Sequence, residues 1–165
     1  MVVVILGVSS ADKTTLGQLL AQELGWRFYE GDDFHSPSNI KKMQRGVPLS
    51  DDDRKPWLGR LRELIEQCLS DNENAVLACS ALKLNYRNRF RVSNEVKFVF
   101  LRGEFALIAN QQRNRIGHFM NPGLLQSQFD ALEEPQPDEN VLIVELGRRP
   151  EEIVAEIEQR LELKT

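Results

Sequence analysis

The chain has 165 residues, which predicts a single domain spanning residues 1–165, because typical domains contain roughly 100–200 residues. Hydrophobic residues make up 41% and charged residues 28% of the chain, and these ordinary globular values exclude disordered and fibrous proteins. The net charge of −4 argues against a nucleic-acid binder or a membrane-surface binder, because both usually carry an excess of basic residues.

Two features bear on where the protein works. Cys68 and Cys79 are the only cysteines and stand in apolar segments, so we expect reduced core thiols rather than a disulfide or a metal site. The apolar run Val2–Leu6 has no basic segment before it and is too short for a signal peptide or a membrane span. Both features predict a cytoplasmic protein, where thiols stay reduced.

The chain begins with short apolar runs that alternate with amphipathic stretches. Val2–Leu6 is continuously apolar and β-branched, which predicts a parallel strand covered on both faces. Residues 14–24 place their leucines on one stripe and end before Gly25, as a helix does. Residues 26–29 predict a second strand, and a polar turn over residues 30–33 follows it.

Two helix starts can be located from their capping residues. Ser36 and Pro37 are typical of an N-cap and a first-turn proline, and they predict a short helix that stops at Gly46. Ser50 and Asp53 form a capping-box pattern at the start of a longer helix, whose apolar residues recur at helical spacing.

The same alternation continues to the end of the chain. Further strands are expected at Ala75–Cys79, 97–101 and 141–146, and helices at 104–113, up to 129 and from Pro150 onward. Residues 133–140 are acidic and rich in proline, so we expect a surface loop there. Strands alternating with helices predict an α/β fold, with a five-stranded parallel sheet flanked by helices on both faces.

A phosphate-binding loop is expected directly after the first strand. The pattern requires glycine, four residues, glycine, lysine and then serine or threonine, and Gly7, Lys13 and Thr14 hold three of these positions. Backbone N–H groups would bind the phosphates of ATP, the lysine would reach the β- and γ-phosphates, and the threonine hydroxyl would bind Mg²⁺. The predicted nucleotide-binding residues are Gly7, Val8, Ser9, Ser10, Ala11, Asp12, Lys13, Thr14 and Thr15.

Asp12 stands where the pattern has its second glycine. Asp adopts a left-handed backbone more easily than most residues, so the conformational cost would stay within about 1–3 kcal/mol. A carboxylate about 5 Å from a phosphate charge would cost about 3 kcal/mol at an effective dielectric of about 20, or roughly a hundredfold in affinity. This cost applies only if the side chain faces the nucleotide.

Further motifs follow the loop in a fixed order. They are Gly25 to His35 (GWRFYEGDDFH), Gly46 to Arg54 (GVPLSDDDR), Cys79 to Lys83 (CSALK), Tyr86 with Arg87 (YR) and Gly117 to Met120 (GHFM). With these motifs the chain resembles, over residues 7–135, the small phosphate-loop gluconokinase family, a relative of shikimate and adenylate kinases. The resemblance implies a three-layer P-loop kinase fold and the reaction of ATP with D-gluconate to give 6-phospho-D-gluconate and ADP. Ser10, Ala11 and Asp12 replace the Gly, Ser and Gly that the family usually has.

The resemblance also implies which residues are catalytic. Lys13 would bind the transferring phosphate, and Asp32 would bind the sugar and accept the proton of its primary hydroxyl. Arg113 and Arg115 would reach the same phosphate from a small lid at about residues 113–122. Phosphoryl transfer also needs Mg²⁺, and Thr14, together with Glu30 acting through water, is expected to hold it.

The substrate-binding residues follow from the chemistry of a sugar acid. Its carboxylate needs fixed cations, with arginine favoured for its two-pronged geometry, and Arg54, Lys83 and Arg87 lie in the matching motifs. His35 and His118 are expected to form hydrogen bonds with hydroxyl groups, and not to bind a metal, because no third ligand is suitably spaced. The resemblance further implies a homodimer.

The sequence therefore predicts a gluconate kinase and keeps two alternatives open. Asp12 leaves room for a non-catalytic or weakly active protein with a degenerate nucleotide site. A kinase for another small hydroxy acid is the second alternative.

Overall fold

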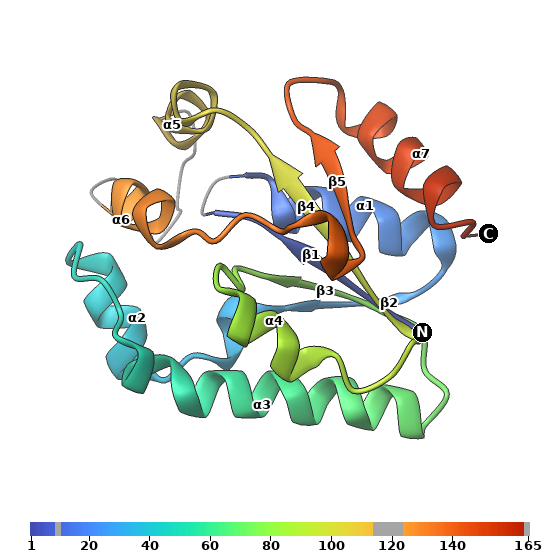
Figure 1. The fold of residues 1–165 in the computed structure, drawn as a ribbon, viewed down its shortest axis with the longest axis horizontal. Helices are drawn as coiled ribbons and strands as arrows, with labels where there is room; N and C mark the ends of the chain where they lie inside the picture. The colour runs from blue at the N-terminus through green and yellow to red at the C-terminus, as the bar shows by residue number, and fades with distance from the viewer. Residues whose placement is uncertain (9–10, 114–123, 164–165) are drawn as a thin grey trace.

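The computed structural model describes residues 1–8, 11–113 and 124–163, and in these ranges a five-stranded parallel sheet lies between layers of helices (Figure 1). The strands are β1 (Val2–Leu6), β2 (Arg27–Glu30), β3 (Ala75–Cys79), β4 (Val96–Arg102) and β5 (Val141–Glu145). The α-helices are α1 (Lys13–Leu24), α2 (Pro37–Gln44), α3 (Asp51–Ser70), α4 (Leu84–Phe90), α5 (Phe105–Arg113), α6 (Leu124–Ala131) and α7 (Pro150–Arg160). The strand order is β2-β3-β1-β4-β5, which confirms the predicted α/β fold.

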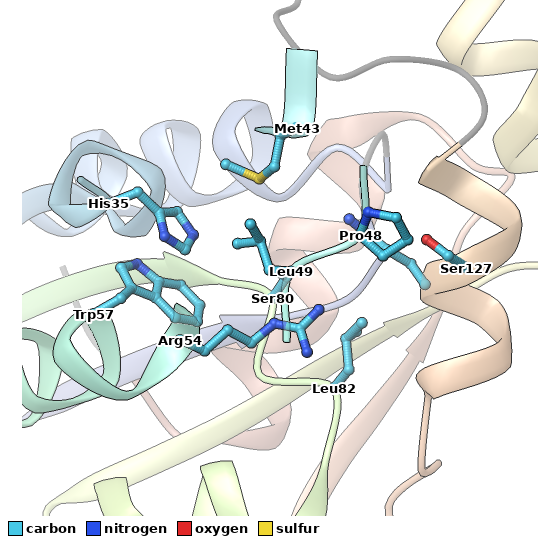
Figure 2. A pocket seen from close by; sticks show the side chains of 10 residues that line it. His35, Met43, Pro48, Leu49, Arg54, Trp57, Ser80, Leu82 and Ser127 are labelled. Carbon is cyan, nitrogen blue, oxygen red and sulfur yellow. The ribbon is translucent and has the colours of Figure 1, made fainter. Parts of the chain in front are cut away.

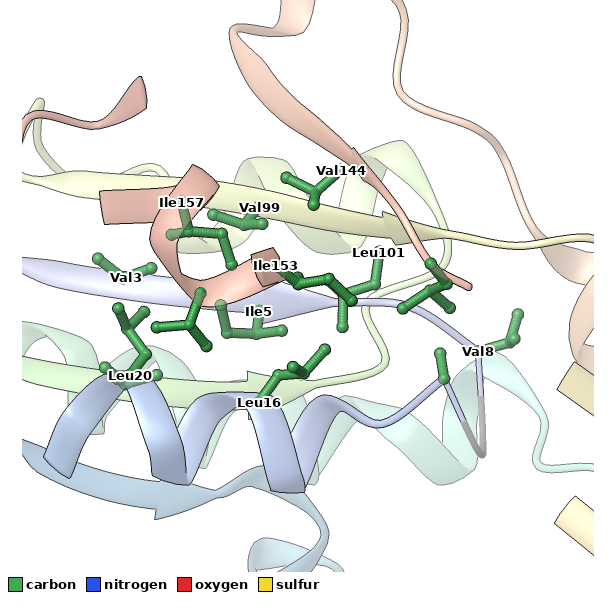
Figure 3. Packing of buried hydrophobic residues seen from close by; sticks show 14 of the residues in the cluster. Val3, Ile5, Val8, Leu16, Leu20, Val99, Leu101, Val144, Ile153 and Ile157 are labelled. Atoms are coloured by element: carbon green, nitrogen blue, oxygen red, sulfur yellow. The ribbon is translucent and has the colours of Figure 1, made fainter. Parts of the chain in front are cut away.

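The sheet separates two apolar layers. Successive side chains of a strand point to opposite faces, so β1 contributes Val3 and Ile5 to the layer of α1 and α7, and Val4 and Leu6 to the layer of α3 and α4. Figure 3 shows the first of these layers, in which side chains of α1 and α7 pack against the strands. Both faces of β1 are thus covered, which explains why its sequence is apolar throughout.

The predicted helix ends are confirmed. The Ser36 side chain accepts a hydrogen bond of 3.1 Å from the Asn39 N–H at the start of α2. At the start of α3, the Ser50 and Asp53 side chains each accept a bond of 3.0 Å from the backbone N–H of the other residue. Gly25 ends α1 in the left-handed conformation, with φ of 71°. These caps fix the directions in which the chain leaves the sheet.

Two segments differ from the expectation. The sequence pattern does not predict α4, which has no side-chain cap and is instead held by the burial of Tyr86, Arg87 and Phe90. Residues 133–140 do not form a purely solvated loop, because the Glu139 side chain is only 7% exposed and binds Arg87. Both cysteines are free and buried, as predicted.

The carboxyl ends of the strands meet along one edge of the sheet, and α2, α5 and α6 lie beyond that edge (Figure 1). The segments that follow β1, β2 and β3 therefore converge there. Ligands of open α/β sheets bind at this edge. Among the helices that the structure describes, none is long and apolar enough to cross a membrane.

Candidate active site

The loop after β1 leads directly into α1. Asp12 is the N-cap of this helix, with φ of 65° and ψ of 26°, a left-handed conformation that favours glycine. The N–H of Leu16 already donates to the Asp12 carbonyl at 2.9 Å. Asp12 therefore provides the backbone conformation that its position requires, in line with the tolerance expected from the sequence.

The loop residues on either side of Asp12 divide into two groups. Val8 and Ala11 are buried in the apolar layer of α1, and a side chain at Gly7 would bring a Cβ within 3.3 Å of the Ala11 Cβ. Lys13, Thr14 and Thr15 form the first turn of α1. The N–H groups and the dipole at such a helix start favour a bound phosphate. Ser9 and Ser10 lie outside the described residues.

Lys13 turns back over the loop. Its Nζ donates a hydrogen bond of 2.7 Å to the Val8 carbonyl. The same ammonium group lowers the pKa of the Asp32 carboxyl, partly offsetting the effect of burial. The lysine of the phosphate loop therefore acts on the carboxyl group that the sequence analysis assigns to catalysis.

The turn after β2 brings Glu30 against α1. The Thr14 hydroxyl donates to Glu30 Oε2, and the Asp32 N–H donates to Glu30 Oε1 at 3.3 Å. The two oxygen groups predicted to hold Mg²⁺ are therefore in contact. Gly31 lets the chain after Glu30 pass close to β3, because a Cβ there would lie 2.5 Å from the Ala78 carbonyl oxygen.

Asp32 has a raised pKa of about 6. The main cause is burial, and the nearby charges of Glu30 and Asp33 add to it, while Lys13 acts in the opposite direction. Its side chain is still 29% exposed, so the carboxyl group lies in a confined place that a reacting group can enter. A carboxylate with a raised pKa is better suited than an ordinary one to accept a proton near neutral pH.

His35 lies on the other side of Asp32. Its Nε2 is 4.0 Å from Asp32 Oδ1, and its ring stacks on Trp57 with the ring centres 4.2 Å apart. Burial, together with the charges of Arg54 and Arg60, lowers the pKa of His35 to about 4, so the ring is neutral at physiological pH. A neutral imidazole ring has one N–H donor and one nitrogen acceptor, so it can form hydrogen bonds with hydroxyl groups.

A pocket opens beside His35, between α2, α3, the segment after β3 and α6 (Figure 2). It is lined by His35, Met43, Pro48, Leu49, Arg54, Trp57, Ser80, Leu82, Ser127 and Gln128. The lining combines an arginine with hydroxyl, amide and imidazole groups. Such a set suits a small, polar and negatively charged molecule, since arginine pairs well with a carboxylate.

Arg54 and Lys83 are brought together by Tyr86. The Arg54 guanidinium lies 5.8 Å from the centre of the Tyr86 ring and donates to its hydroxyl at 3.3 Å. Lys83 Nζ lies 5.7 Å from the same ring and is bound to Asp51 at 3.1 Å. The Tyr86 hydroxyl also donates to Asp51. Arg54 lines the pocket, whereas Lys83 is not among the lining residues and forms an ion pair with Asp51.

Arg87 requires a correction. It is 1% exposed, and its five N–H groups donate to the Glu139 carboxylate and to the carbonyls of Ala81, Leu82 and Glu133 at 2.9–3.2 Å. A guanidinium has only five N–H donors, so none is left for a substrate. The expectation that Arg87 binds the substrate is therefore wrong, and its role is to join α4 to the segment before β5.

Because Arg87 is structural, loss of its ion pair should lower the stability of the fold without a direct effect on substrate binding. Replacing Glu139 by Gln leaves Arg87 buried without its counter-charge, so we expect the free energy of unfolding to fall by about 3 kcal/mol or more. Burial alone would raise the pKa of Glu139, but Arg87 holds it below its usual range. The stabilisation by the Arg87–Glu139 pair is therefore present at neutral pH and is lost as the pH falls through the lowered pKa of Glu139.

Urea unfolding of Glu139→Gln measures this effect, with Glu134→Gln as the matched control. Glu134 pairs with Arg102 at 3.8 Å on the surface, so its loss should change stability by less than about 1 kcal/mol. Equal losses in the two variants would contradict the structural role of the Arg87 pair.

Several predicted site residues cannot be placed. Arg115, His118 and nearly all of the lid expected at about residues 113–122 lie outside the described residues, and Arg113 is described only as the last residue of α5. Other pocket residues were not predicted. The helical spacing of Trp57 indicates a core residue, and no sequence pattern brings Ser80, Ser127 and Gln128 together, although all four line the pocket.

A parallel sheet with a lysine-bearing phosphate loop after β1, and an acid after β2 beside a polar pocket, defines the chain as a P-loop kinase. The comparisons agree, since the family model for shikimate kinase matches residues 9–162. A probable gluconokinase of Mus musculus is 40% identical, with 97% of each chain covered. The chain belongs to the gluconokinase family.

Solved structures extend the match to three dimensions. The unliganded sugar kinase of a Janibacter species has a TM-score of 0.92 at 40% identity, covering 98% of this chain and 94% of its own. The gluconokinase of Sinorhizobium meliloti has a TM-score of 0.82 at 38% identity, covering 97% and 94%. The predicted family and fold are therefore confirmed.

Proposed function

We propose that this protein transfers the γ-phosphate of ATP to the primary hydroxyl of D-gluconate, giving 6-phospho-D-gluconate and ADP. The observation that supports it best is the position of Asp32, between Lys13 of the phosphate loop and the pocket that His35 and Arg54 line. A proton acceptor at the boundary between a triphosphate site and a polar pocket is what transfer to an alcohol requires.

In the proposed reaction the hydroxyl oxygen of the sugar acid forms the new bond to the γ-phosphorus, and the bond from that phosphorus to the β,γ-bridging oxygen breaks. The hydroxyl proton passes to the Asp32 carboxylate, and ADP leaves. The Lys13 ammonium group, which donates to the Val8 carbonyl in this structure, would leave that bond and neutralise charge on the transferring phosphate.

Thr14 and Glu30 are the residues that would hold Mg²⁺. Their hydroxyl and carboxylate oxygens are in contact, and hard oxygen ligands of this kind fit a cation that keeps several of its waters. When bound, Mg²⁺ neutralises charge on the β- and γ-phosphates. Within the described ranges, no three His, Cys, Asp or Glu side chains cluster as a possible metal site.

Arg54 is proposed to bind the carboxylate of the sugar acid from the pocket wall. Lys83 adds positive potential from behind Tyr86 while remaining paired to Asp51. The relatives named above as gluconokinases support gluconate as the acid. We also propose a homodimer, which the family resemblance implies, and a cytoplasmic location, because both cysteines are free and buried.

A coupled assay of ADP release with several acceptors tests the proposal. With saturating Mg·ATP, gluconate should give a rate at least about tenfold above shikimate, glucose and AMP. Glucose is the informative control, because it offers the same primary hydroxyl without the carboxylate that Arg54 would bind. A rate with shikimate or AMP equal to that with gluconate would reject the assignment in favour of another acceptor.

A further inference from the structure

The His35 ring is held in one orientation. It stacks on Trp57 with an angle of 12° between the rings, and its side chain is 3% exposed. Trp57 is itself fixed, because its Nε1 donates to the Gly31 carbonyl at 2.8 Å. Figure 2 shows both rings at the wall of the pocket. The two nitrogen atoms of His35 therefore have distinct and permanent surroundings.

The surroundings of Nδ1 determine which nitrogen carries the proton. The amide nitrogen of Asn39 donates to the Asp53 carbonyl at 2.8 Å and lies 3.4 Å from His35 Nδ1. A carbonyl only accepts, so the NH₂ end of the Asn39 amide must face it, and that NH₂ group can only donate. His35 Nδ1 must therefore be the acceptor of its second hydrogen, which leaves the ring proton of neutral His35 on Nε2.

The surroundings of Nε2 determine what that proton can bind. Nε2 is 4.0 Å from Asp32 Oδ1, which is too far for a direct hydrogen bond. An oxygen atom about 2.8 Å from each would bridge them with two ordinary hydrogen bonds. A hydroxyl group can donate to the carboxylate and accept from Nε2–H at once, whereas an ammonium group has no lone pair to accept.

We propose that Asn39 is a positioning residue, which keeps His35 in its Nε2–H tautomer so that His35 and Asp32 together hold one hydroxyl group of the substrate. The identity of that hydroxyl as the reacting one rests on the proposed function. The assignment extends the site to α2, because Asn39 is buried there at 6% exposure and acts only through His35.

The tautomer can be measured without substrate or turnover. Nitrogen-15 NMR of the imidazole side chains distinguishes a protonated from an unprotonated ring nitrogen, and the sequence has only two histidines, so the His35→Gln variant assigns the signals. Wild-type His35 should be protonated at Nε2 and unprotonated at Nδ1. A wild-type ring protonated at Nδ1 would overturn the proposal.

The Asn39→Asp variant tests the cause. Its carboxylate accepts from Nδ1–H instead of donating, so the tautomer should reverse and Nε2 should lose its proton. With gluconate, kcat should fall about 10–100-fold, because the hydroxyl loses one of its two partners, while KM for ATP should stay within about twofold. An unchanged tautomer together with an unchanged kcat would contradict the role of Asn39.

Ser36→Ala is the matched control. It removes the N-cap of α2 and its bond to the Asn39 backbone N–H, which weakens the helix without touching the Asn39 side-chain amide. It should therefore keep the wild-type tautomer and kcat. If wild-type His35 has the Nε2–H tautomer but gluconate is not phosphorylated, the proposed function fails while the tautomer assignment is supported.

Discussion

Replacing Asp32 by Asn is expected to lower kcat with gluconate by about 10²–10⁴-fold, because the amide cannot accept the proton of the attacking hydroxyl. In the wild type, log(kcat/KM) should rise with a slope near one at pH values below about 6, the pKa of Asp32, and level off above it. KM for ATP should change little, since Lys13 and the start of α1 remain. Steady-state kinetics over a pH series measures all three quantities.

The same substitution should make the fold more stable. Because burial raises the pKa of Asp32 from 3.8 to about 6, the native state holds the proton more tightly than the unfolded state does. Stability therefore falls as the pH rises from about 4 to 6, and the ionised carboxylate remains unfavourable above that. After allowance for its 29% exposure, we expect Asn to increase the free energy of unfolding by about 1–2 kcal/mol at pH 8.

Asp33→Asn is the matched control for both effects. Asp33 is adjacent and acidic but exposed, so its substitution should change kcat and stability only slightly. Loss of activity together with loss of stability in Asp32→Asn, at every pH, would identify Asp32 as a structural turn residue and not a catalytic one.

The second large effect concerns Asp12. Its backbone already has the left-handed conformation of the loop, so the cost that remains is that of its carboxylate charge, which acts in full where the side chain faces the phosphates. The Asp12→Asn variant removes the charge and keeps a side chain that tolerates this conformation. We expect the affinity for Mg·ATP to rise by up to about a hundredfold, the value for a unit charge about 5 Å from a phosphate.

Calorimetric titration of Mg·ATP into the wild type, Asp12→Asn and Asp12→Gly separates charge from conformation. If charge is the cost, the Asn and Gly variants should bind equally tightly and better than the wild type. A gain in Gly alone would assign the cost to the backbone and contradict the tolerance inferred from φ of 65°. Absence of saturable binding to the wild type would favour the degenerate nucleotide site.

The sequence was sufficient to predict the strands and helix caps, because local physics determines them. Continuous apolar runs of five residues such as Ala75–Cys79 are typical of strands covered on both faces, and the Ser50 cap acts within four residues. The strand order and α4 depend on contacts between distant segments. The helix over residues 84–90 forms because Tyr86 and Phe90 are buried against α3 and the sheet, and no short pattern reports that.

The residues of the candidate site also fall into those that local sequence predicts and those that depend on distant contacts. The loop residues and Asp32 were predictable because they follow directly after β1 and β2, whose carboxyl ends must lie at one edge. Arg87 was assigned to the substrate because it lies in a matching motif and carries a charge, yet its partner Glu139 is 52 residues away. Asn39 has no charge and no motif spacing of its own, so only its contacts with His35 and Asp53 identify its role.

The transfer of phosphate itself is the most direct test. Wild-type protein, gluconate and Mg·ATP are incubated together, and phosphorus NMR follows the products with time. The account predicts one new phosphomonoester signal, from the phosphorylated primary hydroxyl of gluconate, that grows in equal amount with ADP and is absent from a Lys13→Ala control. ADP and inorganic phosphate without a phosphorylated sugar acid, or no reaction at all, would contradict it.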